Sequence, residues 1–332
     1  MNKLKGKKIL ITGGTGSLGQ ALTKRLLSEE VDEIRIFSRN ENKQVLMESL
    51  FHNDKLRFLI GDIRDLPRIQ RAVEDVDVVF HAAALKHVPV IELNPFEGIN
   101  TNVIGSRNVI ESCIHEDVEV VVGIGTDKAV SPLNTYGATK LLMEKLFVTA
   151  SNYVNKERHR TRFISLRYGN VLGSSGSVIP KFISQIKAKQ KITITDPSMT
   201  RFSITMDEAL DFILESAMTG KGSEVFVPKL RAFTIGIVKE ALQELLENTG
   251  EMRVPVRQGE KYHETLINLD EIRTTIETDS KYVILQKVPT DDEMNTYSAG
   301  KKTSLTKPYS SDSVKMITKD ELKSLIVQSK LV

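Results

Sequence analysis

Residues 7–19, KKILITGGTGSLG, decide the fold of this chain. The apolar run KKILIT (7–12) ends in glycines, and QALTKRLLS (20–28) then repeats apolar residues at helical spacing. This order predicts a strand, a tight glycine turn and a helix. Apolar runs alternate with helical patterns in the same way through the first half of the chain. Further strands are predicted at 33–39, 55–65, 76–84, 118–126 and 161–171.

The alternation predicts an α/β fold: a Rossmann-type doubly wound parallel sheet with a smaller C-terminal substrate-binding region. We expect a first domain over 1–170, with later strands such as EVFVP (224–228) returning to its sheet. The smaller region is expected over 171–285. The tail, 286–332, is polar and rich in turn residues, so we expect an extended surface arm that ends in a helix capped at Thr318.

The composition is that of a globular protein, with 40% hydrophobic and 27% charged residues among 332. No stretch approaches the roughly 20 apolar residues that cross a bilayer, so we expect no membrane partner. The net charge is only +3 and the basic residues are scattered, which argues against nucleic acid as a partner. The single cysteine, Cys113, cannot form an intramolecular disulfide, so we expect a cytoplasmic protein.

The glycines of the first turn carry the strongest functional signal, a TGxxGxxG pattern between a strand and a helix. Glycine lets the backbone approach a pyrophosphate, whose charge meets the free amides and positive dipole of the helix N-terminus. A plain strand-to-helix turn is the alternative, but the context favours dinucleotide binding. The cofactor contacts expected here and after the fourth strand are Gly13, Thr15, Gly16, Ser17, Leu18, Gly19, Ala82, Ala83 and Ala84.

The end of the second strand indicates which dinucleotide binds. NAD-specific sites place an acidic side chain here to accept the ribose hydroxyls. This chain has Ser38, Arg39 and Lys43, donors that suit a 2′-phosphate, although Glu41 lies among them. We therefore predict NADP as the cofactor.

The third strand ends in Asp62 and Ile63. The carboxylate could accept a hydrogen bond from the adenine amino group while Ile63 packs on the ring. A helix cap is an equally good interpretation of Asp62.

A tyrosine and a lysine stand four residues apart in TYGATK, so on a helix Tyr136 and Lys140 share one face. The nearby ammonium would favour the phenolate and let Tyr136 exchange a proton with a substrate hydroxyl, while Lys140 also holds the nicotinamide ribose. Thr126, at the end of the preceding strand, can hydrogen-bond the reacting oxygen.

An additional acid and base, Asp127 and Lys128, follow Thr126 directly. A plain dehydrogenase has no use for them, whereas an elimination does. Once C4 of a sugar is oxidised its C5 proton is acidic, so Lys128 could remove it while Asp127 protonates the departing C6 hydroxyl. The competing interpretations are a turn cap for Asp127 with a solvated Lys128, and a 4-epimerase or reductase that would not require this pair.

Seven segments together resemble the extended short-chain dehydrogenases, and more narrowly the inverting UDP-N-acetylglucosamine 4,6-dehydratases that begin pseudaminic acid synthesis. They are TGGTGSLG (12–19), FSRNENKQ (37–44), AAALKHVPVIELNPFEGINTNVIGSRNV (82–109), GTDKAVSPLNTYGATK (125–140), RYGNVLGSSGSVIP (167–180), MTRFSIT (199–205) and VRQGEKYHE (256–264).

The resemblance implies five catalytic residues, Thr126, Asp127, Lys128, Tyr136 and Lys140. It implies UDP-N-acetylglucosamine or a close UDP-sugar as the substrate, and a homo-oligomer with the helices around 100–114 and 136–153 as candidate interfaces. No metal is expected. The residues implied to surround the UDP-sugar are Lys86, Asn170, Val178, Lys181, Arg201, Arg257, Glu260 and His263.

Two departures from the family pattern concern the sugar pocket, since Gly125 replaces a common serine and VRQGEK replaces the more usual RPGEK. Tyr136 argues against the retaining relatives, many of which carry methionine there, but soluble retaining enzymes can keep tyrosine. The C5 stereochemistry therefore stays open, and the reaction could also end as a 5,6-ene sugar. Outside enzymes, the alternative is a non-catalytic NADP-binding protein.

Overall fold

The computed structural model describes residues 4–155, 157–174 and 176–332. Its centre is a ten-stranded sheet in the order β16-β14-β15-β10-β6-β5-β4-β1-β2-β3. The strands from β10 to β3 run parallel: β1 (Lys8–Thr12), β2 (Glu33–Ser38), β3 (Leu56–Ile60), β4 (Val78–His81), β5 (Val120–Ile124), β6 (Arg162–Leu166) and β10 (Val225–Pro228). Antiparallel pairing adds β15 (Lys281–Ile284), β14 (Thr275–Glu277) and β16 (Lys301–Lys302) at the β10 edge.

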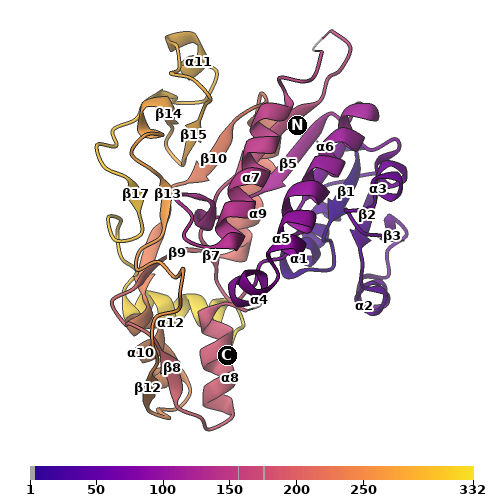
Figure 1. Ribbon diagram of the computed structural model, residues 1–332. Helices are drawn as coiled ribbons and strands as arrows, with labels where there is room; N and C mark the ends of the chain where they lie inside the picture. The colour runs from indigo at the N-terminus through magenta and orange to yellow at the C-terminus, as the bar shows by residue number, and fades with distance from the viewer. Residues whose placement is uncertain (1–3, 156, 175) are drawn as a thin grey trace.

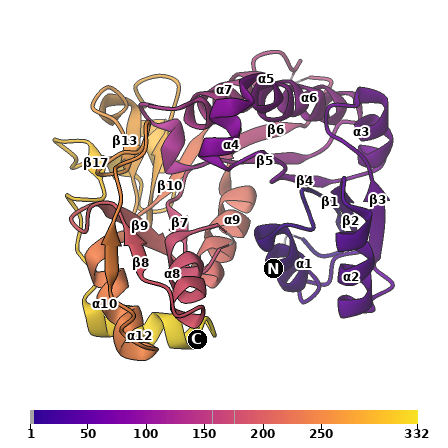
Figure 2. The same ribbon diagram turned by 60° about the horizontal axis from the view of Figure 1, so that its bottom comes forward.

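Helices cover both faces of this sheet (Figure 2). One face carries α1 (Ser17–Leu26), α2 (Glu41–Phe51) and α9 (Met206–Thr219), and the other carries α3 (Leu66–Val73), α6 (Gly105–His115) and α7 (Thr135–Ala150). Because both faces are buried, the strands are continuous apolar runs, which is the pattern that predicted them. The doubly wound sheet is thus confirmed, including the return of EVFVP, which forms β10 beside β6. No helix within the described ranges is long and apolar enough to span a bilayer.

A smaller region follows β6 and lies beyond the β10 side of the sheet (Figure 1). It contains a three-stranded sheet of β7 (Asn170–Val171), β9 (Thr200–Ile204) and β11 (Arg231–Thr234). Two strand pairs accompany it, β8 (Ile192–Ile194) with β12 (Glu251–Arg253), and β13 (Thr265–Ile267) with β17 (Tyr309–Ser310). Its helices α8 (Val178–Lys187), α10 (Ile235–Leu245) and α12 (Lys319–Gln328) share one apolar cluster.

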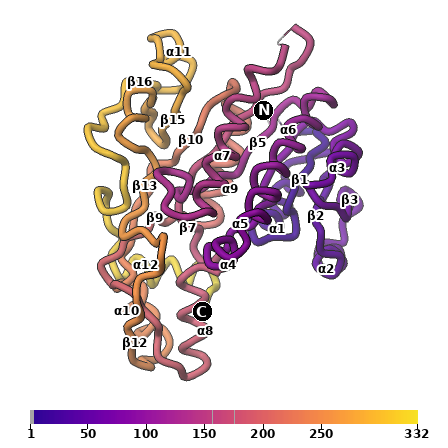
Figure 3. Tube along the Cα trace, viewed as in Figure 1, coloured from indigo at the N-terminus to yellow at the C-terminus, as the bar shows by residue number. Residues whose placement is uncertain are grey.

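The tail differs from the expected surface arm, because it folds onto both parts of the molecule (Figure 3). After α11 (Asp291–Asn295), β16 extends the main sheet, β17 pairs with β13, and α12 packs on α10. Buried side chains such as Tyr309 and Leu322 anchor it, although the surrounding sequence is polar. The predicted helix cap is confirmed, since Thr318 Oγ1 accepts from the Glu321 amide at 3.3 Å and the Thr318 amide donates to Glu321 at 2.9 Å.

Candidate active site

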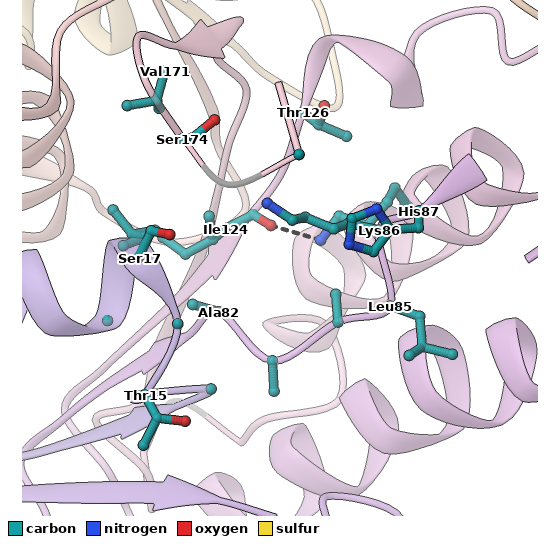
Figure 4. A pocket seen from close by; sticks show the side chains of 18 of the residues that line it. Thr15, Ser17, Ala82, Leu85, Lys86, His87, Ile124, Thr126, Val171 and Ser174 are labelled. Carbon is teal, nitrogen blue, oxygen red and sulfur yellow. Dashed lines mark hydrogen bonds between the residues drawn. The ribbon is translucent and has the colours of Figure 1, made fainter. Parts of the chain in front are cut away.

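The carboxyl ends of the parallel strands border a cavity of about 680 Å³. Ligands of open α/β sheets bind at this edge. Thr15 and Ser17 of the first turn, and Lys86 and His87 of the loop after β4, surround the same space (Figure 4). Every predicted catalytic and cofactor residue lines the cavity, together with two of the predicted substrate residues: Gly13, Thr15, Gly16, Ser17, Leu18, Gly19, Ser38, Arg39, Lys43, Asp62, Ile63, Ala82, Ala83, Ala84, Thr126, Asp127, Lys128, Tyr136, Lys140, Lys86 and Asn170.

The glycine turn forms a cradle into which side chains do not fit. Gly13 has φ +71°, and a Cβ there would lie 2.8 Å from the Ala83 amide nitrogen. A Cβ at Gly19 would overlap the backbone of Gly14. Helix α1 begins after Gly16 with no side-chain cap and no acidic residue in its first turn. The positive end of the α1 dipole therefore meets no carboxylate from its own first turn, which suits the pyrophosphate of a dinucleotide.

The end of β2 presents cationic side chains to the cavity. Arg39 and Lys43 line it beside Ser38, whereas Glu41 lies in the first turn of α2 and is not part of the wall. Arg39 Nη1 lies 3.7 Å from Asp62 Oδ2, so the strand ends of β2 and β3 are joined by an ion pair.

The structure decides between the two interpretations of Asp62. The cap of α3 is Asp65, whose side chain accepts from the Arg68 amide at 3.2 Å. Asp62 instead accepts from the amide and the guanidinium of Arg64, both at 3.0 Å, and it lines the cavity. Burial raises the pKa of Asp62, but the bonds from Arg64 outweigh this and hold the pKa below its ordinary value. The helix-cap interpretation was therefore wrong, and Asp62 faces the cavity as a carboxylate.

The turn after β5 brings an acid and a base together. A short 3-10 helix, Asp127–Ala129, follows Thr126. Thr126 Oγ1 donates to Asp127 Oδ1 at 2.9 Å, and Lys128 Nζ donates to the same oxygen at 3.0 Å. The Asp127 side chain is 1% exposed, and its Oδ2 has no partner among the described residues. Asp127 therefore has one carboxylate oxygen that Thr126 and Lys128 both contact and a second to which no described residue donates a hydrogen bond.

Lys128 has a second acidic neighbour. Its Nζ lies 3.6 Å from Oε1 of Glu264, a buried residue directly before β13. Burial lowers the pKa of Lys128, but the charges of Asp127 and Glu264 outweigh burial and raise the pKa above its ordinary value. In the resting protein Lys128 is therefore an ammonium ion.

Tyr136 and Lys140 lie on α7, whose N-cap, Asn134, accepts from the Gly137 amide at 2.8 Å. Both side chains are buried and line the cavity, as predicted. Lys140 Nζ donates to the Ile124 carbonyl at 2.7 Å. Burial lowers the pKa of Lys140 to about 7.

The expected lowering of the tyrosine pKa by Lys140 is not what the structure shows. Burial raises the pKa of Tyr136, and the cation that acts against this rise is Lys128. The reason is positional, because Lys140 is turned to the β5 backbone while Lys128 faces the phenol from the neighbouring turn.

Six predicted substrate residues lie in the smaller region, outside the cavity wall: Val178, Lys181, Arg201, Arg257, Glu260 and His263. Several of them are nonetheless connected. Arg201 Nη2 lies 3.3 Å from Glu260, and the charge of Arg257 acts on Lys181. His263 Nδ1 lies 2.8 Å from the Thr200 hydroxyl. Arg201 Nε also lies 3.8 Å from Glu264 Oε1, the oxygen that faces Lys128.

Sequence reasoning missed Glu264, Thr101 and His87. Glu264 closes the segment VRQGEKYHE, but no spacing rule connects it with Lys128. Thr101 lies in a π-helical turn, Asn100–Ile104, and its buried hydroxyl has no partner among the described residues. Such turns are frequent at functional sites, but they follow no sequence period. His87 lines the cavity directly after the predicted Lys86, which was the available signal.

A glycine cradle at a helix N-terminus, a tyrosine and lysine on one helix, and a strand-end threonine around one cavity define a site of the extended short-chain dehydrogenase type. The family model described as polysaccharide biosynthesis protein matches residues 9–286. The chain therefore belongs to this family.

Two curated relatives and one solved structure illustrate the similarity. A UDP-glucose 4-epimerase of Rickettsia felis is 41% identical over 331 residues, covering 97% of this chain and 95% of the relative. An inverting UDP-N-acetylglucosamine 4,6-dehydratase of Campylobacter jejuni is 43% identical over 295 residues, covering 88% and 87%. The X-ray structure of Pen from Bacillus thuringiensis has 38% identity and a TM-score of 0.91, covering 99% of both chains. Relatives with epimerase and dehydratase names match almost equally well, so the choice between these reactions rests on the site.

Proposed function

We propose that the chain is an NADP-dependent dehydratase that converts UDP-N-acetylglucosamine to a UDP-4-keto-6-deoxy sugar with inversion at C5. The reaction comprises C4 oxidation, C5 proton removal, loss of the C6 hydroxyl as water and internal hydride return. The observation that carries this proposal is the hydrogen-bonded pair of Asp127 and Lys128 in the cavity that also holds Tyr136. An epimerase or reductase would need the tyrosine but not this pair. The similarity to an inverting dehydratase supports the same choice.

The dinucleotide would bind in the glycine cradle and supply the hydride acceptor and donor. The cradle fits it because the first turn of α1 carries no acidic residue and Gly13 admits close backbone approach. Arg39 and Lys43 would bind a 2′-phosphate, since Ser38 stands where an NAD-specific site has a carboxylate. Asp62 and Ile63 would contact the adenine.

Side chains of the protein would carry out the proton transfers. Thr126 would hold the C4 oxygen, and the phenolate form of Tyr136, which the Lys128 cation favours against the effect of burial, would take the proton of the C4 hydroxyl. Moving the Lys128 proton to Asp127 along their 3.0 Å hydrogen bond would turn the ion pair into a neutral amine and a carboxylic acid. These are the forms that elimination needs, because the amine takes the C5 proton and the acid protonates the leaving C6 hydroxyl. Exclusion of water by a bound substrate favours this neutral pair.

The diphosphate of the substrate would lie toward the cations of the smaller region. Burial lowers the pKa of Lys181, and the charge of Arg257 lowers it further. An anion placed between these two cations would relieve their repulsion, and the Arg201 fork suits phosphate oxygens. Lys86 and Asn170 would then contact the sugar from the cavity wall.

The test is incubation with UDP-N-acetylglucosamine and a trace of NADP in deuterated water, followed by NMR of the sugar and the absorbance of the nucleotide. Redox-neutral loss of water is expected, with deuterium at C5 of the inverted configuration. A retained C5 configuration or a 5,6-ene sugar would keep the dehydratase but change its product. Inversion at C4 without dehydration would make the protein an epimerase, and an unchanged sugar in the presence of bound cofactor would favour a binding protein.

We also propose that the protein is a homo-oligomer. Leu93 is 83% exposed and Phe96 is 78% exposed on the short helices α4 (Val88–Leu93) and α5 (Pro95–Ile99), which contact α7. Exposed apolar side chains gathered on adjacent helices are typical of subunit interfaces. Light scattering should find a multiple of the 37.2 kDa chain, and Phe96→Glu should reduce it. A monomeric wild-type protein would contradict the proposal.

A further inference from the structure

Glu264 is a buried acid to which the proposed proton transfers give no role. Its side chain is 4% exposed, and one oxygen, Oε1, faces two cations: Lys128 Nζ at 3.6 Å and Arg201 Nε at 3.8 Å. The other oxygen, Oε2, is buried and has no hydrogen-bond partner among the described residues. A buried carboxylate is costly unless cations neutralise it, so these two contacts account for its presence in the fold.

The backbone holds this carboxylate in a fixed place. The Glu264 amide donates to Ser311 Oγ at 2.9 Å, and the Ser311 amide donates to the Glu264 carbonyl at 2.8 Å. Ser311 Oγ also lies 2.6 Å from the Thr200 hydroxyl, beside Arg201. The tail segment around Ser311 therefore keeps Glu264 between Lys128 and Arg201.

The charges around Lys128 come from several elements. Asp127 and Glu264 are the negative groups that face it, while Arg201 is the positive group and Tyr136 the titratable neighbour from α7. Lys261 also acts within this cluster, and its Nζ donates to the Val130 carbonyl. Two carboxylates and two further cations thus surround the Lys128 ammonium.

We propose that Glu264 is a positioning residue, which holds the Lys128 ammonium toward the cavity and shares one carboxylate oxygen between Lys128 and Arg201. Arg201 weakens the attraction between Glu264 and Lys128, because the guanidinium neutralises part of the negative charge of the Glu264 carboxylate. The arrangement sets the pH at which Lys128 loses its proton. Only the use of Lys128 as the base rests on the proposed function; the contacts of Glu264 do not.

The test measures the protonation of Lys128 without turnover. Trace acetylation with acetic anhydride modifies only the neutral amine, so mass spectrometry of the Lys128 peptide across a pH series reports its pKa. Glu264→Gln keeps the shape and removes the charge, and it should move this pKa downward by about 1 to 3 units. Glu264→Asp should restore most of the wild-type value. Melting temperature and NADP binding of each variant verify the fold.

Glu119→Gln is the control, because Glu119 pairs with Lys7 at 3.0 Å and forms no ion pair with Lys128 or Arg201 among the described residues. It should leave the labelling curve of Lys128 unchanged. An unchanged curve in folded Glu264→Gln protein would overturn the inference. If that variant does not fold, a wild-type labelling pKa at or below that of an ordinary lysine would overturn it equally.

The same variants separate this inference from the proposed dehydratase activity. If both hold, the alkaline limb of the pH–rate profile moves down in Glu264→Gln by the shift seen in labelling, because a pair that has lost its shared proton has no acid for the C6 hydroxyl. A labelling shift in a protein that does not dehydrate the sugar would remove the proposed function and leave the role of Glu264 intact.

Discussion

Gly125 connects the last paired residue of β5, Ile124, to Thr126, a proposed catalytic residue. A Cβ at this position would overlap the carbonyl oxygen of Leu166 on β6, well inside the 3.0 Å that real Cβ atoms keep. The obstacle is backbone, which cannot rotate away as a side chain does. Gly125→Ala must therefore separate the ends of β5 and β6 by about 1 Å.

This displacement acts on the residues that follow it. Overpacking of a buried position costs about 1–3 kcal/mol, which lowers the melting temperature of a chain of this size by several degrees. A misplacement of about 1 Å in a catalytic group can reduce the rate by about 100-fold. Because Asp127 and Lys128 directly follow the displaced strand end, we expect a loss of about that size in kcat/KM for dehydration, with NADP binding in the glycine cradle largely kept.

The assay compares Gly125→Ala with Gly6→Ala by NMR-monitored dehydration, thermal unfolding and NADP titration. Gly6 has φ +70° and no atom within 4 Å of an added Cβ, so its substitution should cost about 1 kcal/mol of stability without affecting catalysis. Wild-type activity and melting temperature in Gly125→Ala would refute the reasoning, because the two strand ends would then have separated at no cost.

Three further predictions follow from the cavity. Arg39→Ala should weaken NADP binding by about 1.5–3 kcal/mol and leave NAD binding nearly unchanged, measured by fluorescence titration; equal losses for both would contradict the 2′-phosphate assignment. Asp127→Asn should lower dehydration at least about 100-fold while the protein still oxidises C4 and accumulates reduced nucleotide, whereas unchanged dehydration would exclude Asp127 as the acid. The pKa of Lys140 is about 7 in the fold and 10.5 for an ordinary lysine, so the unfolded chain binds more protons between these values and folding stability rises with pH there. Relative to Lys140→Met, wild-type stability should therefore rise by up to about 1.4 kcal/mol per pH unit above pH 7, and a pH-independent difference in melting temperature would contradict the burial argument.

Much of the site could be predicted from local sequence. The glycine turn, the residues at the end of β2 and the TDK and YxxxK segments each lie within a few residues of one another, and the parallel sheet brings their strand ends to one edge. The family resemblance also pointed to Arg201, Arg257 and Lys181, but sequence could not say that these residues lie outside the cavity wall.

The sequence by itself determined the doubly wound sheet, because hydrophobic periodicity indicates which residues of a strand or helix are buried. The glycines indicate where one backbone segment must closely approach another. Only the tertiary structure decided that Asp65 rather than Asp62 caps α3, that the polar tail adds β16 and α12 to the two halves, and that Glu264 reaches Lys128. These outcomes depend on contacts between residues far apart in the chain. Such contacts depend on packing and on the neutralisation of buried charge, and neither produces a periodic pattern in the sequence.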